Sequence, residues 1–319
     1  MKKRIIMRSL RCLLRTNDSI YSDRDVQLFD QKANDYIRDR IHNAKGGLMI
    51  AKFGTVELNT VCCYLAHDKR ISFKTFRNFV RGRITILPDE CFPALCNNAG
   101  FFPEDMILGT KYMRLVLQDA KMIDVLGSYL EMESMLNDYI GKCVRINLNG
   151  YYAPFMWENP WTSELKGKKV LVVHPFVDSI KSQYSHRDKL FVDPNVLPEF
   201  GELKLIKAIQ SITDNDVNCG FDNWFEALDY MKKKIDQQDY DVALIGCGAY
   251  GMHLAAHVKR QGKIAIHLAG WTQMLFGIYG NRWIHDQPEF SKYINEFWTR
   301  PLETEKPRGV QKVENACYW

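Results

Sequence analysis

The amino-acid sequence predicts an α/β protein in which helices flank an open, mostly parallel β-sheet. Short apolar runs of strand length alternate with longer segments of helical periodicity. The run 241–245 ends in Gly246-Cys-Gly-Ala-Tyr-Gly251, and a helical segment follows at 252–260. A second junction of this kind, Gly54-Thr-Val-Glu57, joins a strand predicted over 48–53 to a helix over 57–66. Since parallel strands need crossover connections, this alternation indicates βαβ units.

The first half of the chain predicts three strands and several helices. Besides the two elements named above, helices are expected over 25–43, 91–97, 104–119 and 128–139, and strands over 122–126 and 143–148. The segment 150–168 is rich in Tyr, Trp and Pro, and it predicts a boundary between two lobes. One large α/β unit is the alternative, because 319 residues suffice for either.

The second half continues the alternation. Strands are expected over 169–173, 241–245 and 264–268, and helices over 203–213, 224–236 and 252–260. Residues 301–319 lack periodicity and predict an irregular C-terminal tail. The expected domains are therefore a basic N-terminal segment over 1–20, an α/β domain over 21–300, and this tail.

Charge is concentrated at the start of the chain. Residues 1–15 hold six of the 43 basic residues and no acidic residue, which leaves 37 basic against 38 acidic residues elsewhere. A near-neutral body argues against nucleic acid as a partner. Apolar residues alternate with the basic ones in 1–15, so this segment could lie on an anionic membrane surface, or form a solvated or domain-packing helix.

Targeting and cysteine patterns point to the cytoplasm. Arginines interrupt every candidate signal-peptide core, and no apolar stretch has the length of a membrane span. The nine cysteines are scattered without a Cys-x-x-Cys pair, so a structural zinc site is not expected and most should be reduced. The expected location is cytoplasmic, with peripheral contact at the inner membrane face through residues 1–15.

Four predicted strand ends carry candidate site residues, and ligands of open α/β sheets gather at such ends. Glu57, with Gly54 and Thr55, could bind a metal or a sugar hydroxyl, take a proton from an acceptor, or cap its helix. His174 is a weaker candidate base, as is Asp178. Asp178 and Ser179, with Gln183, could contact phosphate or sugar, or the first two could cap the next helix.

The glycine turn and the segment after 264–268 are the other two candidates. The turn lets backbone N–H groups approach a phosphate, with Gly246, Gly248, Tyr250 and Gly251 as binding candidates. A dinucleotide site would need an acidic residue on the next strand, and 263–270 contains none. The last group comprises Gly270, Gln273 and Arg282, in which the arginine suits a phosphate or a surface ion pair.

Several of these motifs resemble a known family. The segment Phe53-Gly-Thr-Val-Glu57 resembles the Arg-Phe-Gly-Asp-Gly-Glu segment of GT-D-type glycosyltransferases, and the glycine turn with 262–270 is similar to that family's C-terminal strand–turn–helix–strand. A subgroup associated with bacterial surface-polysaccharide genes is more similar, over most of 45–319. Its shared motifs are His174-Pro-Phe176, Gln183-Tyr184, Leu197-Pro-Glu-Phe200, the glycine turn, Phe276-Gly-Ile278, Arg282-Trp283 and Cys317-Tyr-Trp319.

The resemblance implies a Rossmann-like core, a nucleotide-sugar donor, and a role in polysaccharide or capsule biosynthesis. It also implies Mn²⁺ or Mg²⁺ held by an Asp-x-Glu pair, of which Glu57 matches the second acid while Thr55 replaces the first. A neutral hydroxyl is a poor ligand for a hard cation. Either Glu57 works with an acid from elsewhere, or Arg282, lysines and helix dipoles meet the diphosphate charge.

Three functions follow as expectations. The preferred one is a glycosyltransferase that moves a sugar from a nucleotide-diphosphate donor to a surface glycan or lipid-linked acceptor. The alternatives are a nicotinamide-dependent oxidoreductase, which rests on the glycine turn alone, and a non-catalytic nucleotide-sugar-binding protein of the same fold.

Overall fold

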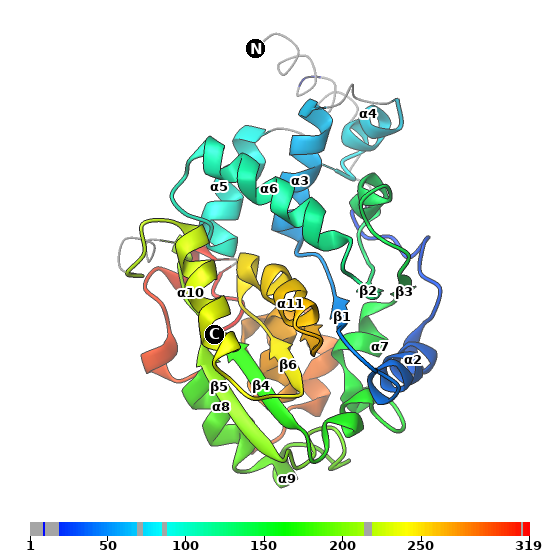
Figure 1. Ribbon diagram of the computed structural model, residues 1–319, viewed down its shortest axis with the longest axis vertical. Coiled ribbons are helices and arrows are strands. Elements are labelled where there is room, and N and C mark those ends of the chain that lie inside the picture. Colours follow the sequence, from blue (N-terminus) through cyan, green and yellow to red (C-terminus); the bar gives the residue numbers. More distant parts are fainter. Residues whose placement is uncertain (1–8, 10–18, 69–72, 85–87, 214–218, 314) are drawn as a thin grey trace.

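Seven parallel strands form one open sheet in the order β3-β2-β1-β7-β6-β4-β5. The computed structural model describes residues 9, 19–68, 73–84, 88–213, 219–313 and 315–319 (Figure 1). The predicted α/β class with a parallel sheet is therefore confirmed, and the arrangement is Rossmann-like. The strands are β1 (Leu48–Ala51), β2 (Val125–Gly127), β3 (Val144–Ile146), β4 (Lys169–His174), β5 (Glu202–Lys207), β6 (Val242–Ile245) and β7 (Ile264–His267).

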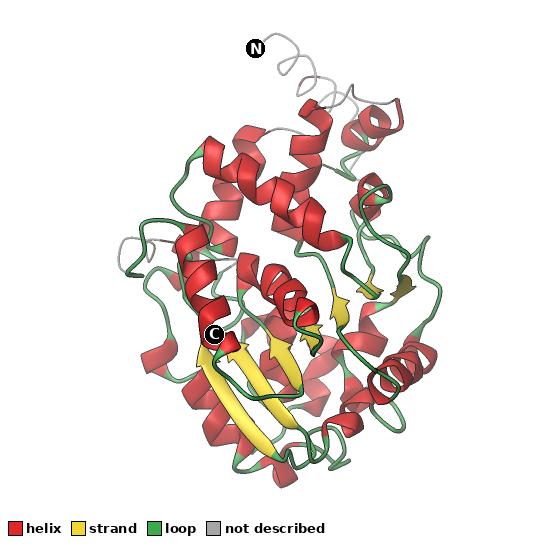
Figure 2. Ribbon diagram, viewed as in Figure 1, coloured by secondary structure: helices red, strands yellow, loops and turns green. Residues whose placement is uncertain are grey.

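Helices cover both faces of this sheet, as the red ribbons around the yellow strands show (Figure 2). Alternate strand residues point to opposite faces, so Met49 packs in one core and Ile50 in the other. One core holds α3 (Thr55–Asp68), α4 (Phe73–Val80), α5 (Pro88–Ala99), α6 (Met106–Ala120), α10 (Trp224–Asp236) and α11 (Gly251–Arg260). The other holds α2 (Asp30–His42), α7 (Leu148–Tyr152), α8 (Val177–Tyr184), α9 (Arg187–Leu190) and α12 (Thr272–Leu275).

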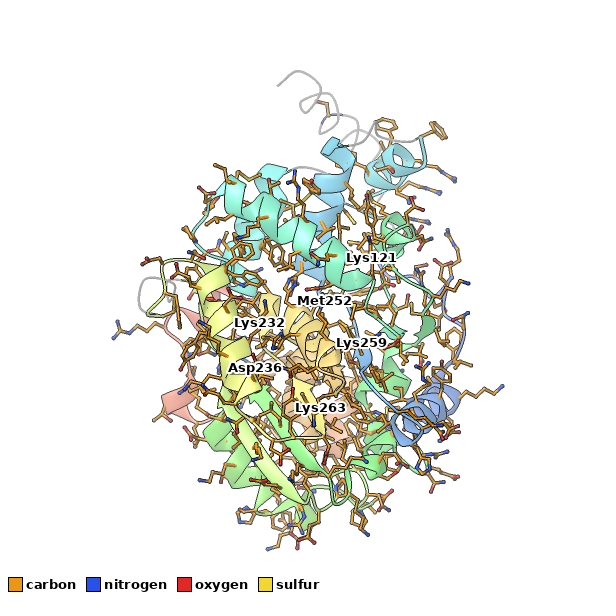
Figure 3. The ribbon with its side chains drawn as sticks, in the orientation of Figure 1. Lys121, Lys232, Asp236, Met252, Lys259 and Lys263 are labelled. Carbon is orange, nitrogen blue, oxygen red and sulfur yellow. A yellow bond between two sulfur atoms is a disulfide. The ribbon has the colours of Figure 1, made fainter. Side chains whose placement is uncertain are left out.

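The helix that follows the glycine turn is anchored on two sides. Lys259 of α11 forms an ion pair of 2.7 Å with Asp124, in the loop that leads from α6 into β2. Asp236 of α10 accepts a 2.6 Å bond from His257 of α11. Asp236 and Lys259 are labelled in Figure 3. These contacts make α11 a fixed support for the turn before it.

Two predicted helices are wrong. The segment predicted as a helix over 203–213 begins with strand β5, which pairs with β4 from Lys169 opposite Glu202 to His174 opposite Lys207. Ladder hydrogen bonds with β4 outweigh the helical spacing of its apolar residues. The segment 128–139 forms only the 3₁₀ turn η1 (Glu131–Leu136), because the Glu133 carboxylate accepts bonds from Tyr129 N and Leu130 N and so closes the chain back on itself.

The segment 150–168 carries the chain across the sheet rather than away from it. It contains the end of α7 and the 3₁₀ turns η2 (Pro154–Met156) and η3 (Trp161–Leu165), and it links β3 at one edge to β4 near the other. The indole of Trp161 is buried and donates to Tyr151 O. Strands from both sides of this segment thus belong to one sheet.

The C-terminal residues are described by the structure, whereas most of the first 18 residues are not. The C-terminal residues form the 3₁₀ turns η9 (Glu303–Glu305) and η10 (Val310–Lys312), and Cys317 and Trp319 are buried. The basic segment 1–15 lies outside the described residues apart from Ser9. Among the described helices, none combines the length and apolar character needed to cross a bilayer.

Among the described cysteines, two form a disulfide and six are thiols, of which three are buried. A disulfide joins Cys63 of α3 to Cys91 of α5. The sequence predicts that most cysteines are reduced, and this pair is the exception among the described residues. Cys62 and Cys247 are buried, and burial raises the pKa of both thiols. Raised pKa values make these two thiols poor nucleophiles.

Candidate functional site

A cavity of about 1300 Å³ lies at the carboxyl edge of the sheet. Parallel strands end at the same edge, so residues that follow all seven strands meet there. The chain leaves β1 toward β2 and β3 but leaves β4 toward β5 on the opposite side, which is the type of switch point at which such sheets bind ligands. The strand-end lining comprises 52, 54–57, 128–129, 147–149, 174–176, 209–212, 246–248, 250, 267 and 269–271.

Most sequence-predicted site residues line this cavity. Those that do are Gly54, Thr55, Glu57, His174, Gly246, Gly248, Tyr250, Gly270, Gln273 and Arg282. Those that do not are Asp178, Ser179, Gln183 and Gly251. The structure therefore brings residues of all four predicted strand ends together: the first and fourth groups in full, the glycine turn without Gly251, and the second group only through His174.

Glu57 lies in the first turn of α3 and folds back over the preceding loop. A Cβ atom added to Gly54 would lie 2.0 Å from Glu57 Oε2, so only glycine leaves room for the carboxylate there. The Tyr129 hydroxyl donates to Phe53 O at 3.0 Å, and therefore accepts the 3.1 Å bond from Thr55 Oγ1. Burial raises the pKa of Tyr129, which keeps this phenol protonated.

The Glu57 corner does not fit a protein-held divalent cation. Within the described ranges, no three His, Cys, Asp or Glu side chains are grouped so that they could hold a metal ion. The Thr55 hydroxyl is already used as a donor to Tyr129, and a neutral hydroxyl is a weak ligand for a hard cation. The cation at this corner is instead Lys52, whose ammonium lies 5.7 Å from the Tyr129 ring centroid.

His174, at the end of β4, is a neutral hydrogen-bond donor. Its Nδ1 accepts the Phe176 N–H at 3.0 Å, so the remaining ring proton is on Nε2. Burial lowers the pKa of His174 to about 3, which excludes the imidazolium at neutral pH. In this tautomer the side chain can donate from Nε2 to a ligand oxygen, but it has no free nitrogen lone pair with which to act as a base.

The glycine turn is shaped by protein neighbours. A Cβ atom on Gly246 would lie 2.4 Å from Ala269 O, and one on Gly251 would lie 2.2 Å from His267 Nε2. Gly248 has a left-handed φ of 54°, and its Cβ would lie 2.8 Å from Ala99 O. Each glycine is thus needed by the fold itself. The turn lines the cavity all the same, because α11 and the end of β7 hold it there.

His267 ends β7 where a dinucleotide-binding site would place an acid. Both ring nitrogens are buried, and the backbone of Lys52 is a neighbour of the ring. Burial, assisted by the charge of Lys52, lowers its pKa to about 3. The imidazole is therefore neutral, and it cannot replace the carboxylate that holds ribose hydroxyls in a dinucleotide site.

Arg282 joins the cavity to the C-terminal residues. Its Nη1 donates to the Tyr318 hydroxyl at 2.9 Å, its Nη2 lies 3.3 Å from Cys317 Sγ, and the guanidinium lies 4.4 Å from the Tyr318 ring centroid. Gln273 Nε2 donates to Tyr318 O at 3.1 Å. A Cβ on Gly270 would lie 2.1 Å from the Tyr318 ring. Tyr318 and Trp319 thus form one wall of the cavity. Contacts with Arg282, Gln273 and Gly270 hold Tyr318 in this position.

The N-terminus of α8 holds an anion from the protein itself. The Glu305 carboxylate accepts from Asp178 N at 2.7 Å and from Ser179 N at 3.2 Å, and it also contacts Ser179 Oγ. Gln183 Nε2 donates to Gly277 O and Phe297 O. The donors predicted to meet a phosphate are occupied by these contacts, so this group serves the packing of the C-terminal segment.

Some lining residues were not among the predicted site residues. Lys52 and His267 stand at the ends of predicted strands, so the strand-end rule could have selected them. Tyr129 follows β2, and its role depends on the wrongly predicted segment 128–139. Tyr318 and Trp319 reach the cavity from a segment without periodicity, which carries no positional signal.

Fold and cavity together define a Rossmann-like α/β protein with a deep, mixed polar and aromatic cavity at the carboxyl edge of its sheet. Comparison with protein-family models, with curated proteins and with solved structures gave no match for the chain. The functional argument therefore rests on the residues of the cavity.

Proposed function

We propose that the protein is a glycosyltransferase that moves a sugar from a nucleotide-diphosphate donor to a glycan or lipid-linked acceptor. One observation carries the proposal: the carboxylate of Glu57 shares a single large cavity with the cations Lys52 and Arg282. A transferase of this kind needs a base for the acceptor and positive charge for the leaving diphosphate.

The size and lining of the cavity suit two substrates. Ligand pockets for one drug-sized molecule are roughly 300–1,000 Å³. The volume of about 1300 Å³ exceeds that range, as a donor together with an acceptor would require. Aromatic side chains line it as well, including the stacked pair Tyr152 and Trp271, whose centroids lie 5.0 Å apart. Such faces can stack on a base or a sugar ring.

The chemical step follows from these groups. Glu57 takes the proton of the acceptor hydroxyl as that oxygen bonds to the anomeric carbon of the donor. The bond from this carbon to the diphosphate oxygen breaks, and the nucleoside diphosphate leaves with the electron pair. Lys52 and Arg282 stabilise the negative charge on the leaving group, and Nε2–H of His174 can donate to one of its oxygens.

The resemblance to GT-D-type enzymes supports the same class and suggests a bacterial surface polysaccharide, such as a capsule, as the product. It also suggests a cytoplasmic enzyme that contacts the inner membrane face through residues 1–15. Of the Asp-x-Glu pair that holds the cation in those enzymes, this chain has only the second acid, Glu57. A divalent cation that arrives with the diphosphate would therefore find one carboxylate of the pair, and no step is assigned to a metal.

The two alternatives receive less support. A nicotinamide-dependent oxidoreductase would need an acid at the end of β7, where His267 stands. A non-catalytic nucleotide-sugar-binding protein would keep Lys52 and Arg282 and make no use of Glu57, so the role of Glu57 separates it from the transferase.

Calorimetric titration with UDP, GDP and dTDP, with and without Mn²⁺, tests the proposal directly. We expect one of these nucleotides to bind, and Glu57→Gln to bind it with unchanged affinity. In a donor-turnover assay, Glu57→Gln should be slower by about 10²–10⁴-fold, the usual contribution of a general base. The exposed Glu104→Gln is the matched control and should be fully active.

Each result has a distinct meaning. Absence of binding to every nucleotide would refute the proposed class. Nucleotide-sugar binding without hydrolysis or transfer by the wild-type protein would favour the non-catalytic alternative.

A further inference from the structure

The side of the cavity next to β2 and β3 has an outer rim, which consists of Tyr21, Asp23, Phe29, Asp30, Asn147 and Asn149. It is formed by the segment 21–30, which ends at the first residue of α2, and by two residues at the start of α7. None of these residues carries a role in the proposed chemical step.

The rim is built into the sheet edge through the backbone. Ser22 N donates to Tyr129 O at 3.0 Å, and Asn147 N donates to Leu28 O at 3.0 Å. Isolated bridges pair Tyr21 with Leu130 and Leu28 with Ile146. The segment therefore continues the wall beyond the last strand and has a defined position.

Asp30 and Asn147 lock the two parts of the rim together. Asp30 N donates to Asn147 Oδ1 at 2.8 Å, and Asn147 Nδ2 donates to Asp30 Oδ1 at 2.7 Å. Asp30 also adopts a left-handed φ of 54°, which costs a non-glycine residue free energy and persists only where its contacts hold it. Asp30 thus has a strained backbone held by two hydrogen bonds to Asn147 at the cavity mouth, and strained backbone is found preferentially at functional positions.

The rim presents unused aromatic and polar groups. Tyr21 is 66% exposed and Phe29 is 43% exposed, although large apolar side chains usually avoid solvent. In the described part of the chain, the Asp23 carboxylate and the Asn149 amide make no side-chain hydrogen bond or ion pair. Exposed rings beside carboxylate and amide groups match a carbohydrate, whose C–H faces stack on rings while its hydroxyls donate and accept.

Charge argues for this occupant over others. The rim has two carboxylates, Asp23 and Asp30, and no Lys or Arg among its six residues. An anionic lipid surface or a nucleic acid would be repelled by them, because both carry phosphate.

The rim leads directly to the Glu57 corner. The Tyr21 and Tyr129 rings are stacked, with centroids 6.2 Å apart and an angle of 27°, and the Tyr129 hydroxyl bonds Thr55 at 3.1 Å. We infer that the rim is the subsite for a carbohydrate acceptor, held so that one of its hydroxyls reaches Glu57. The assignment of an acceptor rests on the proposed function; the carbohydrate-binding chemistry rests on the rim alone.

A glycan array of mono- and oligosaccharides tests the inference. The array is probed in the presence of UDP at about 1 mM, which suffices to fill a typical weak site. The wild-type protein should bind at least one glycan, and the double variant Tyr21→Ala, Phe29→Ala should bind it at least tenfold more weakly. Tyr21→Phe should retain binding because the ring remains. Phe73→Ala is the matched control, since Phe73 is 82% exposed on α4 and does not line the cavity.

Other readouts separate the inference from the proposed function. Calorimetry should give the same UDP affinity for the double variant, and circular dichroism should give the same fold. A wild-type protein that binds no glycan, or a double variant that binds as well as wild type, would overturn the inference. So would sedimentation with phosphatidylserine vesicles that depends on Tyr21 and Phe29. Glycan binding without any nucleotide binding would keep the inference and refute the proposed function.

Discussion

Glu305 should determine both the stability of the protein and the shape of its cavity. Its side chain is 3% exposed, and its carboxylate accepts from Asp178 N, Ser179 N and Ser179 Oγ at the start of α8. It begins the C-terminal stretch that ends in Tyr318 and Trp319 at the cavity. Replacing it should therefore weaken nucleotide binding as well as folding.

The expected loss can be estimated from the contacts. Glu305→Ala leaves Ser179 N and Ser179 Oγ buried without an acceptor, at about 1–3 kcal/mol each, whereas Asp178 N can turn to water. The lost anion at the N-terminus of α8 adds about 0.3–1 kcal/mol. The free energy of unfolding should thus fall by about 2–7 kcal/mol, a range that includes the roughly 3–5 kcal/mol typical of breaking a buried charged contact. Glu305→Gln keeps one acceptor oxygen and should lose about 1–2 kcal/mol.

Urea unfolding followed by tryptophan fluorescence is the assay, combined with nucleotide titration. The control is Glu303→Ala, on the same 3₁₀ turn, because Glu303 is 85% exposed in a weak pair with Lys306. That variant should stay within about 0.5 kcal/mol of wild type. If Glu305→Ala lowers stability no more than Glu303→Ala does, the anchoring role assigned to Glu305 is refuted.

Three further predictions concern the glycine turn, the histidines and the arginine. Gly251→Ala places a Cβ 2.2 Å from His267 Nε2 and should lower the free energy of unfolding in urea by about 1–3 kcal/mol. In the control Gly46→Ala, the new Cβ meets no atom within 4 Å, so the loss should be much smaller. Equal losses in the two variants would contradict the packing argument. Burial lowers the pKa of His174 and His267 from 6.5 to about 3. Below pH 6.5 the unfolded chain therefore binds more protons than the folded protein does. The stability that comes from keeping these two histidines neutral is present above pH 6.5 and is lost as the pH falls toward 3. The free energy of unfolding should differ by about 1 kcal/mol per histidine between pH 6.5 and pH 5.5. His267→Asn should remove the contribution of one histidine, and an unchanged difference would show that His267 is not excluded from protonation. Arg282→Lys loses the paired contacts to Tyr318 and Cys317, so UDP affinity should fall about 10–100-fold by calorimetry, and an unchanged affinity would exclude Arg282 from the donor site.

Local patterns predicted most of the sheet. The runs 48–51, 169–173, 242–245 and 264–267, which are apolar except for Lys169 and His267, become buried strands, because a strand covered on both faces needs apolar residues at nearly every position. The edge strand β5 was missed for the opposite reason. Glu202 and Lys207 are exposed, and Leu203, Leu205 and Ile206 fit a helix as well as a strand until β4 pairs with this segment.

The site residues divide in the same way. Glu57, His174 and the glycine turn could be selected because each lies at or shortly after the end of a predicted strand, and parallel strands bring their carboxyl ends together. The exclusion of Asp178 and Ser179 could not be predicted, since the carboxylate that occupies them is 126–127 residues away in the chain.

The sequence by itself determined the α/β class, the parallel sheet and the strand ends at which a cavity would form, because periodicity and turn chemistry are local properties of the chain. Only the tertiary structure decided which groups face that cavity. Glu305 took the N-terminus of α8, Tyr318 and Trp319 closed a wall around Arg282, and the segment from Tyr21 to Asp30 extended the rim. Each of these is a contact between residues distant in the chain, and its free energy depends on a geometry that exists only after the sheet has formed.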